Sequence, residues 1–102
     1  MPANFDVRLE KMAPSSWGLH IRNNGAGSIP ELQVELDGTL VHEHPAFLEN
    51  QPDRGMVEDL AGGKEVAYLL MTHDESLQPP YELRIVHTDR DGVSHEYSST
   101  IG

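Results

Sequence analysis

The sequence predicts an all-β fold, an antiparallel β-sandwich of about seven strands. Apolar and polar residues alternate over 17–22, 31–37 and several other runs, and a period of two is typical of a strand with one buried face. Residues that favour turns separate these runs at intervals of roughly eight to twelve positions. No run shows a clear helical period, so we expect the 102 residues to form one all-β domain spanning 1–102.

Four strands are expected in the first half of the chain, over 5–11, 17–22, 31–37 and 39–42. Trp17 alternates in phase with Leu19 and Ile21, so we expect it to pack in the core rather than to anchor a partner at the surface. Asp37-Gly38 predicts a tight hairpin turn, because both residues tolerate the positive φ angles that such a turn requires.

The segment 43–59 has no alternation and contains Pro45 and Pro52. Long connections without periodicity are uncommon in compact domains and are often functional. We expect short extended pieces at 47–48 and 56–57 to pair at a sheet edge. We also expect this segment, with any unpaired edge strand beside it, to be the main interaction surface.

A run from Val66 to Met71 is apolar on both faces, which predicts a strand covered at least in part on both sides. Val66, Tyr68 and Leu70 form one of these two strand faces. A loop over 74–80 follows and leads to Tyr81, which is placed to act as a tyrosine corner, with its hydroxyl bonded to nearby backbone.

The last strands, over 81–88 and 93–101, form the clearest hairpin of the sequence. A three-residue loop at 90–92, with Gly92 in the left-handed region, matches the apolar faces of the two strands. This register pairs Ile85 with Tyr97 and His87 with His95. A four-residue loop would mix buried and exposed faces, so we prefer the three-residue loop.

Three turns carry a family resemblance: Asn23–Gly27 after the second strand, Leu60–Glu65 before the run that begins at Val66, and Asp89–Gly92 in the final hairpin. With these turns the chain resembles bacterial immunoglobulin-like modules of the CARDB kind. Gly62 stands where those modules commonly have proline. The resemblance implies an immunoglobulin-like sandwich that serves adhesion-related binding or spacing and has no catalytic residues.

Charge and composition exclude several classes of function. Seventeen acidic and seven basic side chains give a net charge of −10, which opposes contact with nucleic-acid phosphates or an anionic membrane surface. The absence of cysteine excludes disulfides and cysteine-ligated zinc. No apolar run is long enough to span a membrane. With no leader-like start, we expect a cytoplasmic protein, or an extracellular or periplasmic one if the chain is part of a larger protein.

Four histidines are the candidate metal ligands. His42 and His44 flank Glu43, and alternate residues of a strand share a face. His87 and His95 are opposite each other in the predicted hairpin, which would suit a bridging metal or a pH-sensitive pair. Two ligands do not complete a site, so we expect no metal or cofactor. We expect the first pair to be two exposed histidines beside a loop, and the second to be a polar pair at the solvated end of the hairpin.

Other chemistry is sparse. Asp89 and Asp91 lack the further ligands of a calcium loop, so we expect them to cap their turn. The serines lie in no nucleophile-elbow sequence, and no glycine-rich phosphate loop precedes a helix. We therefore expect no enzymatic activity.

The sequence-based hypothesis is a non-catalytic domain that recognises another protein or assembles with it, with self-association through an edge strand as one form. The alternative is a small acidic inhibitor or nucleic-acid mimic, of phage or mobile-element type, that binds a basic target. A third class is a metal-dependent enzyme that uses the histidines. A clustered carboxylate face would support the mimic, and an evenly spread charge would oppose it.

Overall fold

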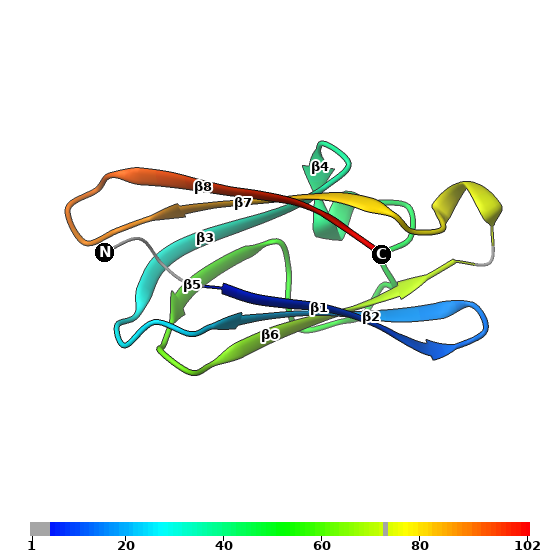
Figure 1. Cartoon of the computed structure of the whole chain (residues 1–102), viewed down its shortest axis with the longest axis horizontal. Coiled ribbons are helices and arrows are strands. Elements are labelled where there is room, and N and C mark those ends of the chain that lie inside the picture. The colour runs from blue at the N-terminus through cyan, green and yellow to red at the C-terminus, as the bar shows by residue number, and fades with distance from the viewer. Residues whose placement is uncertain (1–4, 73) are drawn as a thin grey trace.

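The computed structural model describes residues 5–72 and 74–102 and confirms the all-β sandwich. Two antiparallel sheets form its two layers (Figure 1). The described residues contain eight strands: β1 (Phe5–Ala13), β2 (Ser16–Asn23), β3 (Ile29–Leu36), β4 (Thr39–Leu40), β5 (Met56–Leu60), β6 (Glu65–Met71), β7 (Tyr81–Thr88) and β8 (Ser94–Ile101). Two single turns of 3-10 helix, Val41–Glu43 and Glu75–Leu77, interrupt them.

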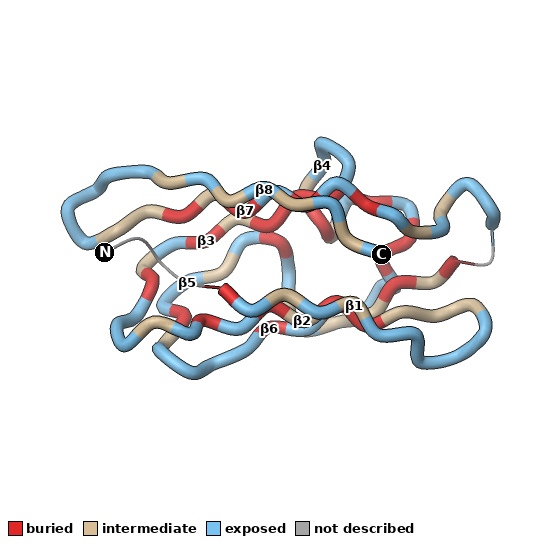
Figure 2. The backbone as a smooth tube through the Cα atoms, viewed as in Figure 1, coloured by how far each residue is buried: buried red, intermediate tan, exposed pale blue. Residues whose placement is uncertain are grey.

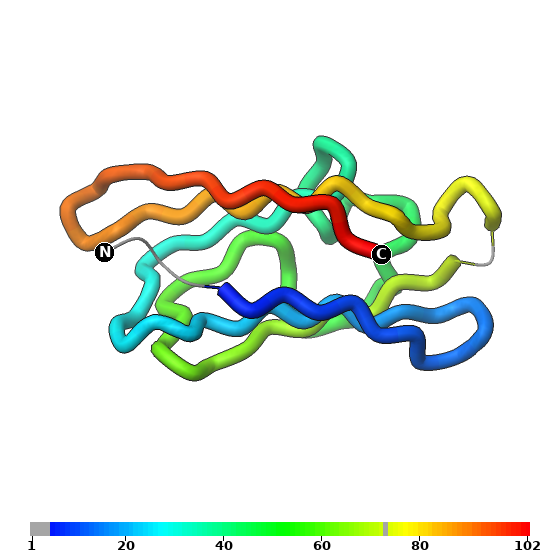
Figure 3. Tube along the Cα trace, in the orientation of Figure 1, coloured from blue at the N-terminus to red at the C-terminus, as the bar shows by residue number. Residues whose placement is uncertain are grey.

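The first sheet has the strand order β1-β2-β6, and the second has the order β4-β3-β7-β8. Strand β5 pairs with the first half of β3, from Ile29 opposite Leu60 to Gln33 opposite Met56. All of these pairings are antiparallel. The chain crosses between the two layers several times along its length (Figure 3). Neighbouring strands in a sheet are therefore often distant in sequence.

The core fills the space between the two inner faces (Figure 2). Leu19 and Ile21 from the first sheet, and Val34 and Ile85 from the second, are completely buried. Trp17 packs against this cluster at one end and is only half-buried, which confirms its predicted position on the core side of β2. One shared apolar layer thus accounts for the alternation seen in the sequence.

Both predicted hairpin turns are confirmed. Asp37 and Gly38 have φ angles of 52° and 86°, as a tight turn of this kind requires. In the last hairpin His87 is opposite His95, and the backbone N–H of Asp89 donates to the carbonyl of Val93. Gly92 has φ 80°, which confirms the three-residue loop.

The strand expected over 39–42 ends at Leu40. Val41 turns inward and is completely buried, and a 3-10 turn follows. Burial of Val41 therefore draws the chain away from the edge of β3 and into the core. At the other end of the molecule, β1 runs on to Ala13, past the predicted end at Lys11, with a register shift between these two residues.

The segment 43–59 is packed onto the sandwich. Phe47 is buried and forms a bridge to Leu70 of β6, and residues 56–60 form β5, so both predicted extended pieces pair with sheet edges. The side-chain amide of Gln51 completes the contact. It accepts from the backbone N–H of Leu69 at 2.6 Å and donates to the carbonyl of the same residue at 2.8 Å.

Strand β6 buries the face that contains Val66, Tyr68 and Leu70, as predicted. On its other face, Leu69 and Met71 are half-buried and Ala67 is exposed. Of the two faces of β6 that were predicted to be buried at least in part, only one is therefore fully buried. The amide of Gln51, which reaches Leu69 from the edge, provides part of this outer contact.

Tyr81 forms the predicted corner contact. It is buried at the start of β7, and its hydroxyl donates to the backbone carbonyl of Leu77 at 2.5 Å. Burial, together with the nearby Asp37 carboxylate, raises the pKa of the Tyr81 hydroxyl to about 12. The group therefore keeps its proton and remains a hydrogen-bond donor to the loop.

Asn23 ends β2 and joins three parts of the chain. Its buried side-chain amide donates to the carbonyls of Gly27 and Leu60, and its side-chain oxygen accepts from the N–H of Gly25. Gly62 approaches the same loop so closely that a Cβ there would be 2.5 Å from the carbonyl oxygen of Gly25. The β2–β3 and β5–β6 connections are therefore fixed against each other.

We predict that Asn23→Ala lowers the free energy of unfolding by about 2–4 kcal/mol, because it leaves buried backbone groups of the two loops without partners. Urea denaturation would measure the change. The control is Asn24→Ala at the exposed neighbouring position, with an expected change within about 0.5 kcal/mol. Equal effects of the two substitutions would contradict this role of Asn23.

Candidate interaction surfaces

The predicted histidine pair lies at the end of the sandwich where the β7–β8 hairpin turns. The rings of His87 and His95 stack, with centroids 5.1 Å apart and an interplanar angle of 22°. The Phe5 and His87 rings form a T-shaped contact, with centroids 5.3 Å apart. His87 is 6% exposed, so the expectation of a polar pair at the solvated end is wrong for this residue. The cause is Phe5, which extends the core over it.

His95 is half-buried and is held by the adjoining turn. Its Nε2 atom lies 3.0 Å from Oδ2 of Asp89. Oδ1 of Asp89 accepts from the backbone N–H groups of Asp91 and Val93. The hydrogen bond with His95, followed by those to the backbone, lowers the pKa of Asp89. The predicted capping role is thus confirmed for Asp89.

A hollow of about 630 Å³ adjoins these histidines, between the β2–β3 loop and the β7–β8 loop. His87 and His95 form part of its wall, and the small residues Gly25, Ala26 and Gly27 form another part. Among the residues that the structure describes, no group hydrogen-bonds the His87 ring. The described residues contain no group of three or more histidine, aspartate or glutamate side chains placed to hold a metal ion.

His42 and His44 do not share a strand face, so that expectation is wrong. The 3-10 turn at Val41–Glu43 directs them to different partners. Nδ1 of His42 accepts from the N–H of Gly55 at 3.0 Å. His42 is half-buried and His44 is buried, so the expectation of two exposed histidines is also wrong. Nδ1 of His44 accepts from the N–H of Ala46, and its Nε2 lies 3.0 Å from the Asp37 carboxylate. Both rings therefore stabilise the segment 43–59.

Acidic side chains are distributed unequally over the two outer faces. The outward-facing strand positions of the first sheet carry three carboxylates and two arginines, namely Asp6, Glu10, Glu65, Arg8 and Arg22. The second sheet carries five carboxylates and one arginine on outward-facing strand positions: Glu31, Glu35, Glu58, Glu82, Glu96 and Arg84. Charge that is dispersed along the sequence is therefore concentrated on one face of the fold.

Arg84 neutralises part of this face. Its guanidinium lies 3.2 Å from Glu35 and 3.0 Å from Glu96, and the hydrogen bond from Arg84 lowers the pKa of Glu96. Glu31 and Glu58 are directly opposite each other on β3 and β5. Neither forms an ion pair with any residue in 5–72 or 74–102. Like charges in this position oppose each other.

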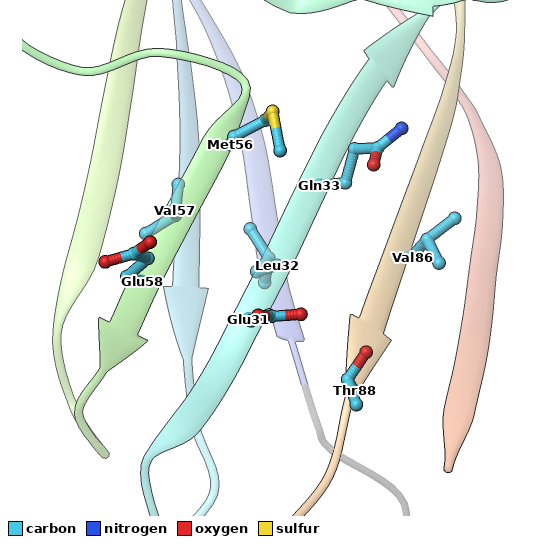
Figure 4. Close-up of a pocket in the computed structure, with 8 residues that line it drawn as sticks. All are labelled: Glu31, Leu32, Gln33, Met56, Val57, Glu58, Val86 and Thr88. Atoms are coloured by element: carbon cyan, nitrogen blue, oxygen red, sulfur yellow. The ribbon is translucent and has the colours of Figure 1, made fainter. Parts of the chain in front are cut away.

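A groove of about 400 Å³ runs across this part of the second sheet, over β5, β3 and β7 (Figure 4). One cross-strand row of its lining contains Met56, Gln33 and Val86. The next row contains Glu58, Glu31 and Thr88. The Met56 side chain is 66% exposed. The groove thus sets an exposed apolar side chain next to two carboxylates without counter-ions.

Sequence analysis did not identify this groove. The alternation over 31–37 does place Glu31, Gln33 and Glu35 on one face, so part of the signal was present. Met56 and Glu58 lie in the segment that showed no alternation, and only the pairing of β5 with β3 brings them alongside. Within the segment 43–59, Met56 and Glu58 thus lie in this groove, whereas Phe47 packs on the sandwich and residues 48–50 are exposed outside the groove. The role of the segment as an interaction surface stays a prediction.

Comparison with known proteins gives no relative: no family model, curated protein or solved structure matches the chain. Within the described part of the chain, no helix has the length and apolar character needed to cross a membrane.

We predict that stability falls as the pH is lowered below about 6.5 because of His87. Burial, and then the neighbouring His95, lower the pKa of His87 below its ordinary value of 6.5, against the opposing charge of Asp89. The unfolded chain therefore binds the additional proton first. The stabilisation is complete above the unfolded pKa and is lost as the pH falls toward the folded pKa.

Urea denaturation between pH 8 and pH 5 would measure this dependence, with His87→Phe as the comparison because phenylalanine keeps an aromatic ring against Phe5 and His95. We expect a smaller loss of stability with falling pH in the variant. The same loss in both proteins would show that His87 is not the responsible group.

Proposed function

We propose that this chain is a non-catalytic domain that recognises another protein through the groove on the outer face of the second sheet. The observation that carries the proposal is the pair Glu31 and Glu58, opposite each other without counter-ions and next to exposed Met56. A partner segment with a lysine or arginine beside an apolar side chain would match both rows of the groove.

Two energetic arguments support this partner chemistry. Opposed carboxylates destabilise the free protein, and a cation from a partner removes that repulsion. Exposed Met56 and half-buried Val86 still have apolar surface to bury, which contributes roughly 25 cal/mol per Å². Methionine is also flexible enough to adapt to side chains of different shape.

We further propose that the sandwich is immunoglobulin-like. The order β1-β2-β6 facing β4-β3-β7-β8 and the tyrosine-corner bond of Tyr81 support this class. The turn residues that resemble CARDB-type modules support it independently. A binding module needs no catalytic group, and this proposal gives the histidines structural roles in the fold.

The acidic-mimic hypothesis has one supporting observation, the five carboxylates of the second sheet. The two proposals differ in what drives binding. A mimic that binds a basic target by charge alone would lose its affinity at high salt. Recognition through Met56 and Val86 as well as the carboxylates would leave measurable binding there.

The test is selection of peptides from a displayed random library, followed by affinity measurement at low and high salt. We expect the selected peptides to combine lysine or arginine with an adjacent apolar residue. The double variant Glu31→Gln/Glu58→Gln should lose about tenfold in affinity, or about 1.4 kcal/mol. The same variant should unfold at higher urea concentration, because the opposed charges are gone.

The matched control is Glu43→Gln/Glu49→Gln, which makes the same charge change at two exposed positions of the segment 43–59. It should bind the selected peptides within a factor of about two. If both double variants weaken binding equally, net charge and not the groove is responsible. Complete loss of binding at high salt would favour the mimic.

A further inference from the structure

The sheet edges of this protein differ in how they are protected against pairing with another strand. An exposed edge presents unpaired backbone groups, and natural proteins usually cover or interrupt it. Strand β1 pairs regularly with β2 from Phe5 to Lys11 and shifts register only beyond Lys11, but it carries Arg8 and Lys11, and charged side chains of this kind oppose the addition of another strand. The edge of β6 is covered at Leu69 by Gln51 and at Leu70 by the bridge from Phe47.

The edge of the second sheet beside β3 is also interrupted. Strand β4 has two residues, and β5 has five. Asp59 in β5 has φ 51°, which breaks the regular extended backbone. Neither strand offers a long, regular edge.

Strand β8 is different. It is eight residues long and pairs with β7 in continuous register from Ser94 to Ile101. It contains no proline, lysine or arginine, and its one charged residue, Glu96, is ion-paired with Arg84. No residue in the described ranges pairs with the outer side of β8.

The backbone groups of this outer side can be assigned. The N–H of Asp89 donates to the carbonyl of Val93 at the start of the hairpin. Because antiparallel pairs alternate between bonded and non-bonded positions, the bonded residues of β8 are the odd-numbered ones. The N–H and carbonyl groups of Ser94, Glu96, Ser98 and Thr100 therefore point away from β7.

The core is also incompletely closed on this side. Strands β1 and β8 lie side by side, one in each layer (Figure 3), and the Phe5 and Tyr97 rings are 6.0 Å apart. Four apolar residues that pack on the core from these two strands remain half-buried: Val7, Leu9, Tyr97 and Ile101. A partner that pairs with β8 would reach this row as well.

We propose that the protein forms a two-fold symmetric dimer by antiparallel pairing of β8 with β8 of a second copy. A two-fold interface uses the same surface of each copy. A second copy therefore offers a free, regular strand edge to pair with β8 and a half-buried apolar row to pack against this one. An axis at Tyr97 or at Ser98 pairs residues of the same face. It places Glu96 opposite Ser98 or Thr100, so the two Glu96 carboxylates do not oppose each other.

The net charge of −10 on each chain opposes this association. The repulsion is long-range and is screened by salt, whereas strand pairing and apolar contact act at short range. The dimer should therefore become stronger as salt is added. Peptide binding at the acidic groove should weaken under the same conditions, so the two proposals can fail separately.

The test is the molar mass in solution, measured by light scattering and sedimentation from micromolar to millimolar concentration, at low and high salt. We expect twice the mass of one chain at high concentration, with a dissociation constant that falls at least tenfold with added salt. Ser98→Pro should be monomeric under all these conditions. Proline at an outward-pointing N–H is compatible with an edge strand and removes a donor that a second strand needs.

Two further variants separate loss of pairing from loss of folding. Ser98→Glu/Thr100→Glu places carboxylates opposite Glu96 of the second copy in either register without restricting the backbone, and it should also be monomeric. Glu31→Gln/Glu58→Gln, in the groove, should remain dimeric. In turn, Ser98→Pro should still bind the selected peptides.

The position of the interface can be tested directly, because the chain has no cysteine of its own. A spin label on Ser98→Cys should show strong label-to-label coupling in the dimer. A label on Thr39→Cys, at the opposite edge of the second sheet, should show weak coupling. A monomer at all concentrations, or a dimer that persists in both edge variants, would overturn the proposal.

Discussion

The buried side-chain amide of Asn23 holds the two sheets of this sandwich together at one end. It ends β2 of the first sheet and reaches the carbonyl of Leu60, where β5 of the second sheet ends. It also closes its own loop through Gly25 and Gly27. With its donors and its acceptor all bonded, the amide is buried without the usual cost of desolvation. This contact ties β2 of one layer to the end of β5 in the other and so fixes the two layers against each other at this end of the core.

One core layer leaves little interior for a binding site. The inner faces of the two sheets pack against each other. The polar side chains of the protein therefore lie mostly on the outer faces, in the loops and at the strand edges. Three buried residues, His44, Asn23 and Tyr81, use their polar atoms to bind backbone or turn residues. The proposed recognition at an outer face is consistent with this arrangement.

Local turn chemistry explains which parts of the fold could be predicted from sequence. Asp37-Gly38 and Gly92 determine their hairpins within a few residues, and the register of β7 with β8 follows from matching faces, so the pairing of His87 with His95 was predictable. The burial of His87 was not, because Phe5 covers it from the far end of the chain. Sequence alternation identifies a face but not what packs on it.

The segment 43–59 also could not be predicted from local sequence patterns. Its buried residues, among them Ala46 and Phe47, are placed by contacts with β6 and have no periodicity to reveal them. The groove needs β5, β3 and β7 together, and β8 is a free edge only because no other described strand pairs with it. Both surfaces are defined by the pairing of distant segments. A property that depends on which strands are neighbours, or on which strand has none, cannot be read from one strand alone.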